Sequence, residues 1–345
     1  MRDRNGNALK RLPEALLPWF RENARDLPWR RDREPYHVWL SEIMLQQTRV
    51  EAVRGYYERF IKTLPDIPSL AAAELDTVYK LWEGLGYYSR ARNLHTAARQ
   101  ILSEHGGVFP SDHERIRALR GVGDYTAGAI ASICFDAPTP AVDGNVLRVV
   151  SRLTADGRPV NEEATKSAVR AALSEVYPAG YCGEFTQALM ELGAVVCVPN
   201  GAPACGACPA RALCASRDGD WKRFPVRAPK KARRQERLTV FLFTRGGALA
   251  LRKRPDAGLL AGLWELPNVP GHLAPEQAVR QAEAWKLKPL ELLREARRTH
   301  IFTHVEWDMR VYTLSVRAAG ADLVWAGERD LEQSYSLPTA FRKCL

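Results

Sequence analysis

Residues 119–130 read LRGVGDYTAGAI and place a glycine turn between two segments that look helical. Apolar side chains recur at helical spacing before the turn, over 112–119, and after it, over 124–135. Glycine adopts conformations closed to other residues and lets another molecule approach the main chain closely. The N–H groups that open the second helix lack partners within it and can bind an anion such as phosphate. The stretch therefore predicts either a helix–helix corner or a pair of helices that clamps a phosphate backbone.

Charge and composition limit the classes of function. The 345 residues include 50 Lys and Arg against 40 Asp and Glu, a formal net charge of +10. A basic protein binds polyanions by releasing their counterions, so nucleic acid is a candidate partner, although the same excess also serves solubility. With 46% hydrophobic and 26% charged residues, the chain is neither disordered nor collagen-like. The sequence has no apolar run long enough for a transmembrane helix and no secretory signal, which predicts a cytoplasmic protein.

The sequence pattern changes near residue 222. Residues 222–237, KRFPVRAPKKARRQER, hold eight basic residues, one acidic residue and two prolines, which predicts a basic linker. Before it, helices are expected over 36–50, 69–82, 89–104, 112–119, 124–135, 144–153, 162–176 and 184–197. After it, LTVFLFTRGGALALRKR (238–254) predicts two strands joined by a Gly-Gly turn, 307–318 predicts a further strand, and 274–286 predicts a helix. An all-α domain, 1–221, is thus expected before an α+β domain, 238–345.

Four of the seven cysteines fall within CVPNGAPACGACPARALC, residues 197–214. In a cytoplasmic protein, clustered thiols predict metal ligands rather than disulfides, with buried free thiols as the alternative. Zinc sites usually show two close cysteine pairs, whereas only Cys205 and Cys208 are close here. The uneven spacing favours a [4Fe–4S] cluster. Cys134 and Cys182 are expected in the core.

Two carboxylates, Glu42 and Asp143, are candidates for an acid–base pair, although their spacing in the sequence does not by itself pair them. Glu42 shares a polar stripe with Gln46 and Arg49 on the otherwise apolar helix expected over 36–50. Apolar neighbours should raise the pKa of Glu42 and keep it protonated near neutrality, as a general acid requires. Asp143 precedes another expected helix, and N-capping that helix is its structural alternative. Cleavage of a glycosidic bond uses one acid for the leaving group and one carboxylate that faces the cationic sugar.

Taken together and in this order, the motifs resemble those of the MutY adenine DNA glycosylases of the helix–hairpin–helix base-excision superfamily. The matching stretches are LPWR (27–30), SEIMLQQTRV (41–50), LWEGLGYYSRARNL (81–94), LRGVGDYTAGAI (119–130), AVDGNVLRV (141–149), the four-cysteine loop and IFTHVEW (301–307). The resemblance implies a multidomain fold: an all-α helix–hairpin–helix glycosylase domain with a [4Fe–4S] loop, and an α+β Nudix-like lesion-recognition domain. It divides the first domain into a six-helix module, about 29–133, and a cluster module, 1–28 with 134–221. The implied activity is removal of adenine mispaired with 8-oxoguanine, and with guanine, from double-stranded DNA by a monomer.

The resemblance also implies a role for individual residues. Glu42 would protonate the departing adenine, Asp143 would stabilise the oxocarbenium ion, and Asn145 would orient Asp143. Tyr125 stands where bifunctional relatives carry a Schiff-base lysine, so no lysine-based strand cleavage is expected. Adenine-pocket contacts are implied for Trp29, Arg30 and Gln187, duplex contacts beside the lesion for Gln47, Thr48 and Tyr87, contacts with the oxidised guanine for Phe302, Thr303 and His304, DNA-backbone contacts for Gly121 and Gly123, and iron ligation for Cys197, Cys205, Cys208 and Cys214.

Some residues depart from the family pattern. The first cysteine spacing is seven residues where the family commonly has six, and the loop VPNGAPA has no basic residue, a loss for which Arg211 and Arg217 are expected to compensate. Thr303 replaces a frequent serine and keeps its hydroxyl. The region 258–286 keeps a GLWELP element but lacks the glutamate run of Nudix hydrolases, so no nucleotide hydrolysis is expected. A C-terminal domain that only packs is the alternative to lesion recognition.

Two rival functions share parts of the pattern. An endonuclease-III-like glycosylase and AP lyase acting on oxidised pyrimidines would share the hairpin and the cluster, but Tyr125 and the additional C-terminal domain disfavour it. A non-catalytic DNA-binding or cluster-sensing protein would need neither Glu42 nor Asp143.

Overall fold

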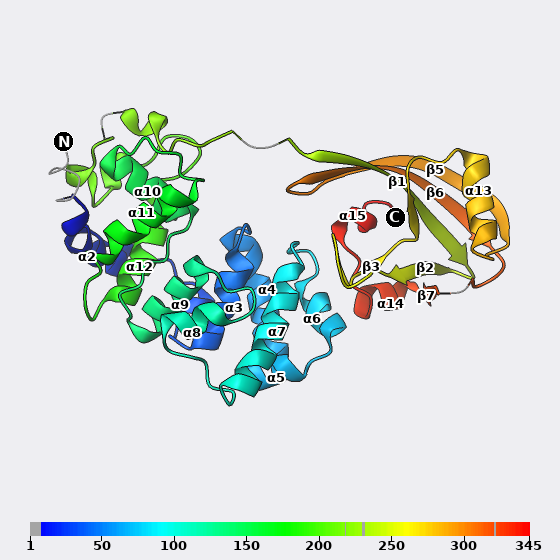
Figure 1. Cartoon of the computed structure of the whole chain (residues 1–345), viewed down its shortest axis with the longest axis horizontal. Coiled ribbons are helices and arrows are strands. Elements are labelled where there is room, and N and C mark those ends of the chain that lie inside the picture. Colours follow the sequence, from blue (N-terminus) through cyan, green and yellow to red (C-terminus); the bar gives the residue numbers. More distant parts are fainter. Residues whose placement is uncertain (1–7, 218, 230–231, 321) are drawn as a thin grey trace. The chain divides into compact units, whose positions relative to one another are not determined.

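The computed structural model describes residues 8–217, 219–229, 232–320 and 322–345 (Figure 1). The chain forms two compact units. One comprises Met1–Ala71 and Thr96–Pro229, and the other comprises Ala72–His95 and Lys230–Leu345. A short stretch of the N-terminal half therefore belongs to the unit that contains the C-terminal sheet.

The first unit is helical. Its helices are α2 (Leu12–Asn23), α3 (Pro35–Leu45), α4 (Val50–Thr63), α5 (Ile67–Ala72), α8 (His113–Ala118), α9 (Asp124–Phe135), α10 (Gly144–Thr154), α11 (Glu163–Ser174) and α12 (Cys182–Glu191), together with the C-terminal part of α7 (Ser89–Glu104). Short helical turns follow at Leu192–Val196, Cys205–Ala207, Arg211–Leu213 and Asp220–Arg223. Buried apolar side chains of α2, α10 and α12 form one core, and Cys197, Cys208 and Cys214 pack against its edge.

The glycine turn joins two helices as expected. Asp112 caps α8 by accepting the backbone N–H of Arg115 at 2.9 Å, and Gly121 has a φ of +78°. Gly123 has a φ of −99° and is the N-cap of α9, so of these two glycines only Gly121 uses the left-handed conformation. No atom lies within 4 Å of the position that a Cβ of Gly123 would take. Its missing side chain therefore leaves the first N–H groups of α9 open to another molecule.

The helix expected over 36–50 ends earlier, at Leu45. Gln46 leaves the helical conformation, Gln47 has a φ of +59°, and α4 begins at Val50 after the extended Arg49. The predicted polar stripe of Glu42, Gln46 and Arg49 on one helix is therefore wrong. The Nε2 of Gln46 instead donates to Oγ1 of Thr126 on α9 at 3.3 Å, which ties this bend to the helix after the glycine turn.

Two other expected helices are interrupted. The segment 69–82 divides into α5 and α6 (Leu75–Trp82), and the helix expected over 184–197 continues past Glu191 only as the wider turn Leu192–Val196. Cys182 is buried as expected, whereas Cys134 is half-buried. Within the described ranges, no helix is long and apolar enough to cross a membrane.

The second unit is built on a sheet whose strands run in the order β3-β2-β1-β6-β5. The strands are β1 (Arg234–Arg245), β2 (Ala248–Lys253), β3 (Trp264–Glu265), β4 (Asn268–Pro270), β5 (Pro289–Ile301), β6 (Val305–Val316) and β7 (Val324–Ala326). β1 pairs with β6 in parallel register, and β5 pairs with β6 in antiparallel register. Gly246 and Gly247 both have positive φ and join β1 to β2, which confirms the expected hairpin. β1 begins inside the stretch predicted as a linker, and two residues of that stretch, 230 and 231, lie outside the described residues.

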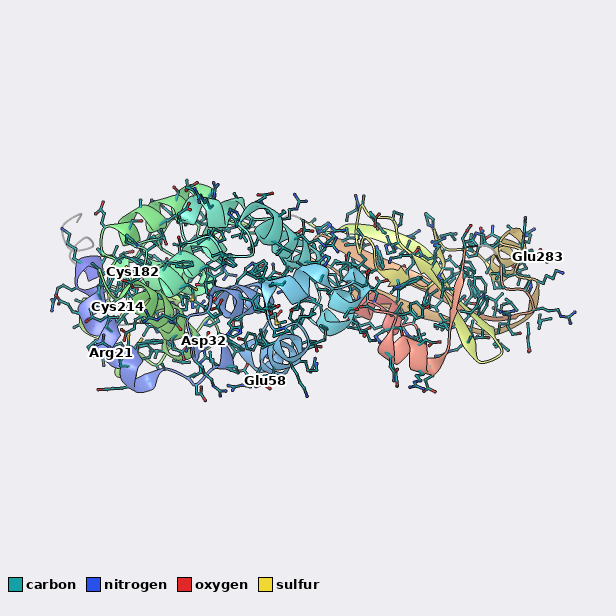
Figure 2. The ribbon with its side chains drawn as sticks, turned by 90° about the horizontal axis from the view of Figure 1, so that it is seen from below. Arg21, Asp32, Glu58, Cys182, Cys214 and Glu283 are labelled. Carbon is teal, nitrogen blue, oxygen red and sulfur yellow. The ribbon has the colours of Figure 1, made fainter. Side chains whose placement is uncertain are left out.

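Helices cover both faces of this sheet. On one face, α13 (Pro275–Ala284) packs its alanines against aromatic residues of β1 and β6. Glu283 of α13 is labelled in Figure 2. On the other face, α15 (Thr339–Arg342) places Phe341 against Trp307. The short helix α14 (Glu328–Gln333) precedes α15.

Candidate active site and cysteine cavity

Glu42 lies on α3 in an apolar part of the helical unit and is only 6% exposed. Burial raises the pKa of this carboxyl from 4.5 to about 7. A hydrogen bond from Tyr125 and the positive charge of Arg30 lower this pKa, and the negative charge of Asp143 raises it further. Glu42 therefore exchanges a proton in the neutral pH range, as a general acid or base does.

Asp143 is the N-cap of α10. Its Oδ1 accepts the backbone N–H of Val146 at 2.7 Å, and its Oδ2 accepts Nδ2 of Asn145 at 2.8 Å. Burial raises the pKa of Asp143 above its ordinary value, while these hydrogen bonds and the charge of Arg148 oppose the rise. The residue thus satisfies the capping prediction and also presents a half-buried, oriented carboxyl group.

Tyr125 joins the two carboxyl groups into one site. Its hydroxyl donates to Oε2 of Glu42. Burial raises the pKa of Tyr125 well above 10, and the negative charges of Glu42 and Asp143 raise it further, so the side chain stays a neutral phenol. Since each charge acts on the same phenol, the structure brings Glu42, Tyr125, Asp143 and Asn145 together as the sequence predicts.

Sequence reasoning missed Glu191, which supports this site from α12. Its side chain is fully buried and accepts Nε of Arg25 at 2.6 Å and Nη2 of Arg30 at 2.8 Å. Burial raises the pKa of Glu191, but the hydrogen bonds and charges of the two arginines outweigh burial and bring it to about 2. Glu191 therefore fixes Arg30, whose charge acts on Glu42. A single glutamate in the apolar run ALMELGAVV was the only available signal.

Arg148 connects the carboxyl site to the cysteine loop. Its Nη2 donates to Oδ1 of Asn145 and to the carbonyl of Gly193, each at 2.7 Å, and its Nε donates to the carbonyl of Cys197 at 2.7 Å. The same amide that orients Asp143 is thus held by an arginine bound to the first cysteine of the loop.

Four cysteines line one cavity in the helical unit: Cys197, Cys205, Cys208 and Cys214, the last of which is labelled in Figure 2. Arg152, Arg211, Arg217 and Trp221 also line this cavity. Burial and, to a smaller extent, the negative charges of the other three thiols together raise the pKa of Cys208 to about 11, so each of those thiols lies within electrostatic reach of Cys208. Nη1 of Arg152 donates to Sγ of Cys197 at 3.3 Å.

The donor atoms of this cavity are thiol sulfurs, which suit zinc or an iron–sulfur cluster. Among the described residues, no group of three or more His, Cys, Asp or Glu side chains is arranged to hold a single metal ion. A zinc site needs its ligands about 2.0–2.3 Å from one point, whereas a [4Fe–4S] cluster is held by four cysteines around a larger body. Four cysteine thiols that line one cavity fit the ligand set of a [4Fe–4S] cluster, which four cysteines hold.

The other predicted contacts in the helical unit lie near the site or at the surface. Trp29 is buried and packs edge-on against Tyr57, with ring centroids 5.5 Å apart. Gln187 on α12 is half-buried, and Gln47 is exposed in the bend after α3. Oγ1 of Thr48 donates to the carbonyl of Gln46 at 3.4 Å within that bend.

The predicted lesion contacts gather in the second unit. Tyr87 is 46% exposed, and its hydroxyl lies 3.0 Å from Oγ1 of Thr303. Phe302 packs edge-on against His300 and Trp307, with centroids 4.5 and 4.8 Å apart, while Thr303 and His304 are exposed. The structure therefore brings Tyr87 to the turn between β5 and β6.

The glutamate of the GLWELP element, Glu265, is bound by other side chains of the protein. Glu265 is 2% exposed, accepts Nη2 of Arg252 at 2.7 Å and Nδ2 of Asn268 at 2.8 Å, and pairs with Arg254. A carboxylate committed to two guanidinium groups is poorly placed to bind a divalent cation.

Two parts of the chain match known protein families. Residues 40–179 match the family described as HhH-GPD superfamily base excision DNA repair protein, and residues 239–345 match the NUDIX domain. The chain is 36% identical to the adenine DNA glycosylase of Mus musculus, over 91% of this chain and 72% of that protein. It is 30% identical to the adenine DNA glycosylase of Buchnera aphidicola subsp. Baizongia pistaciae, over 96% of this chain and 95% of that protein. A solved thermostable thymine-DNA glycosylase aligns with a TM-score of 0.56 at 27% identity, covering 61% of this chain and 97% of that one. These matches confirm the expected fold class and enzyme class.

Proposed function

Because the chain belongs to the adenine DNA glycosylase family, we propose that it excises adenine mispaired with 8-oxoguanine, and with guanine, from double-stranded DNA. The observation that carries this proposal is the buried Glu42, whose pKa is about 7, beside a second, half-buried carboxyl group, Asp143. A binding module has no need of a buried carboxyl group that exchanges a proton near neutral pH, since burying an ionised carboxylate is costly.

In the proposed reaction, protonated Glu42 gives its proton to the ring of the departing adenine. The N-glycosyl bond breaks and its electron pair leaves with the base, so positive charge develops on the sugar as an oxocarbenium ion. Asp143 faces that charge as a carboxylate, held by the N–H of Val146 and the amide of Asn145. Water then adds to the sugar carbon, and its proton passes to the Glu42 carboxylate, which restores the acid.

Tyr125 separates this chemistry from that of a lyase. A phenol has no amine with which to form a Schiff base to the opened sugar, so the proposed enzyme removes the base without lysine-driven strand cleavage. Borohydride trapping should therefore give no strong covalent complex. A trapped complex that depends on a lysine would favour the alternative, an endonuclease-III-like lyase on oxidised pyrimidines.

DNA would be held through its backbone and opened at the mispair. The turn at Gly121 and Gly123, which is open at Gly123, and the first N–H groups of α9 suit a phosphate. Extruding a base costs a few kcal/mol, which inserted side chains offset, and Gln47 and Tyr87 are the proposed wedges. The turn Phe302–His304 would contact the oxidised guanine. Trp29, Arg30 and Gln187 would line the adenine pocket.

The four cysteines of the cavity would hold one [4Fe–4S] cluster. Such a cluster would supply a rigid centre that fixes the loop 197–214 against the core of α2, α10 and α12. Arg148 would then hold the side chain of Asn145 in a fixed position, since it binds both the loop and that amide.

The decisive test is Glu42→Gln, which removes the proton donor and keeps the shape of the side chain. This variant should bind duplex DNA with an adenine:8-oxoguanine mispair, while its single-turnover excision rate falls by about 10²–10⁴-fold. Glu58→Gln is the matched control, because Glu58 is an exposed glutamate on α4, labelled in Figure 2. Near-normal excision by Glu42→Gln would remove Glu42 from the role of acid.

A further inference from the structure

Within the second unit, helix α6 forms hydrogen bonds with a segment near the C-terminus of the chain. The helix belongs to the part of the chain that matches the HhH-GPD family, and the segment belongs to the part that matches the NUDIX domain. Helix α6 and the turn after it lie within residues 40–179, whereas the tail segment 331–342 lies within residues 239–345. Nζ of Lys80 donates to the carbonyl of Leu331 at 3.0 Å, and Oγ of Ser336 donates to the carbonyl of Tyr79 at 3.2 Å. We call these contacts, with those of Glu83 below, the tail latch.

Glu83 is the centre of the tail latch. Its Oε1 accepts Nε and Nη2 of Arg342, at 2.9 and 2.6 Å, and also the backbone N–H of Leu337 at 3.0 Å. Its Oε2 accepts Nζ of Lys80 at 2.7 Å. The Glu83 side chain is 15% exposed, so water screens these charge-assisted bonds less than it screens an open surface pair.

Glu83 stands directly before a tightly constrained turn. It is the C-cap of α6, and Gly84, Gly86 and Tyr87 follow with φ of +104°, +71° and +49°. The carbonyl of Gly86 accepts Nε1 of Trp82 at 3.1 Å and Nη2 of Arg90 at 3.2 Å. A non-glycine residue in the left-handed region persists only where its surroundings hold it. The position of Tyr87 therefore depends on where α6 ends.

The turn after α6 places Tyr87 beside residues 302–304, the turn proposed to contact the oxidised guanine, which we call the lesion loop. The Tyr87 hydroxyl lies 3.0 Å from Oγ1 of Thr303, in the turn that joins β5 to β6. The segment 80–87 thus contacts residues more than two hundred positions later in the sequence at two places, the tail latch and this hydroxyl pair.

We propose that the tail latch sets the preference for the base opposite adenine. By fixing the end of α6, it holds Tyr87 beside Thr303, so that the wedge and the lesion loop meet the opposite base as one surface. Glu83 and Arg342 are positioning residues, since they act through Tyr87. The proposal rests on the proposed function. In this proposal, recognition of 8-oxoguanine needs both Tyr87 and the turn that contains Thr303, whereas ordinary guanine makes fewer contacts with that turn. Loosening the tail latch should therefore slow adenine excision more opposite 8-oxoguanine than opposite guanine.

The test compares second-order single-turnover rate constants for adenine opposite 8-oxoguanine and adenine opposite guanine. Glu83→Gln and Arg342→Leu should each lower the ratio of the two constants by about fivefold or more. The effects of the two substitutions should be less than additive in the double variant, because both weaken the ion pair between Glu83 and Arg342. Arg329→Leu is the matched control: it removes the same charge from α14, where Arg329 hydrogen-bonds Gln333 and lies outside the latch.

A purely structural role would give a different result. Loss of folded enzyme lowers both rate constants equally and leaves their ratio unchanged, so unchanged ratios in Glu83→Gln and Arg342→Leu would overturn the proposal. Independent, additive effects in the double variant would overturn it as well. If the unmodified enzyme excises adenine from neither duplex, the proposed function itself fails; if it excises and discriminates while the variants keep its ratio, only the tail latch fails.

Discussion

Replacing Glu42 by glutamine should stabilise the folded protein at alkaline pH although it removes the proposed catalytic acid. Burial raises the pKa of Glu42 from 4.5 to about 7. The folded state therefore holds this proton more tightly than the unfolded state does. As pH rises from about 4.5 to about 7, the unfolded chain loses the proton first, and the free energy of unfolding falls.

The size of the effect follows from the two pKa values. Each unit of pKa difference corresponds to about 1.4 kcal/mol, so ionised Glu42 costs the folded state about 3 kcal/mol above pH 7. At pH 5 most of this cost is absent, because the folded state keeps the proton. Glutamine never ionises and can still accept the Tyr125 hydroxyl. The gain from Glu42→Gln should thus grow by about 2–3 kcal/mol between pH 5 and pH 8.

Thermal unfolding of both proteins at pH 5 and pH 8 measures this growth. For a domain of this size, about 1 kcal/mol shifts the Tm by about 2–4 °C, so the Tm gap should widen by about 5–10 °C toward pH 8. Other titrating groups affect both proteins equally and cancel in the gap. Glu58→Gln makes the same chemical change at an exposed position and should give a gap that does not depend on pH.

A Tm gap between Glu42→Gln and the unmodified protein that stays constant from pH 5 to pH 8 would refute the reasoning. It would mean that folding does not raise the pKa of Glu42, because a carboxyl whose pKa is unchanged or lowered by folding is mostly ionised in both states over this pH range.

Three further predictions concern the same unit. Excision by the unmodified enzyme should fall as pH rises above about 7, because Glu42 loses its proton; Tyr125→Phe should move this fall to higher pH, since it removes a hydrogen bond that lowers the pKa of Glu42, and an unmoved pH–rate profile would contradict this. Asp143→Asn should keep the Tm within a few degrees, because asparagine also caps helices well, yet lower the excision rate by about a hundredfold or more; a folded variant with normal activity would exclude Asp143 from the reaction. Cys205→Ser should reduce the iron content and visible absorbance of the purified protein, whereas Cys134→Ser should change neither; equal iron in both variants would contradict the proposed ligand set.

Local sequence signals predicted much of the helical unit. The ranges expected for α7 and α9 agree with the structure at both ends, since a turn bounds each helix on either side. The end of α3 was predicted too late because the conformation of Gln47, with a φ of +59°, is not visible in its local pattern. Strand β5 was missed: its sequence PLELLREARRTHI is rich in helix-forming residues, and only pairing with β6 makes it a strand.

The candidate site also contains residues that the sequence predicted and residues that it did not. Local context made Glu42 and Asp143 candidates, and the family resemblance paired them. The structure adds the hydrogen bond from Tyr125 to Glu42 and the link from Arg148 to Cys197. Glu191 was not predicted, because its partners Arg25 and Arg30 lie more than 160 residues away in the sequence. The grouping of residues 72–95 with the C-terminal sheet was also not predictable, since it depends on contacts such as those of Glu83. The roles of the DNA-contacting residues stay predictions.

The most direct measurement of the central claim is single-turnover adenine release from three duplexes that differ only in the base opposite the target. Adenine opposite 8-oxoguanine and opposite guanine should yield free base, and adenine paired with thymine should yield none. Release confined to the adenine:thymine duplex would contradict the account.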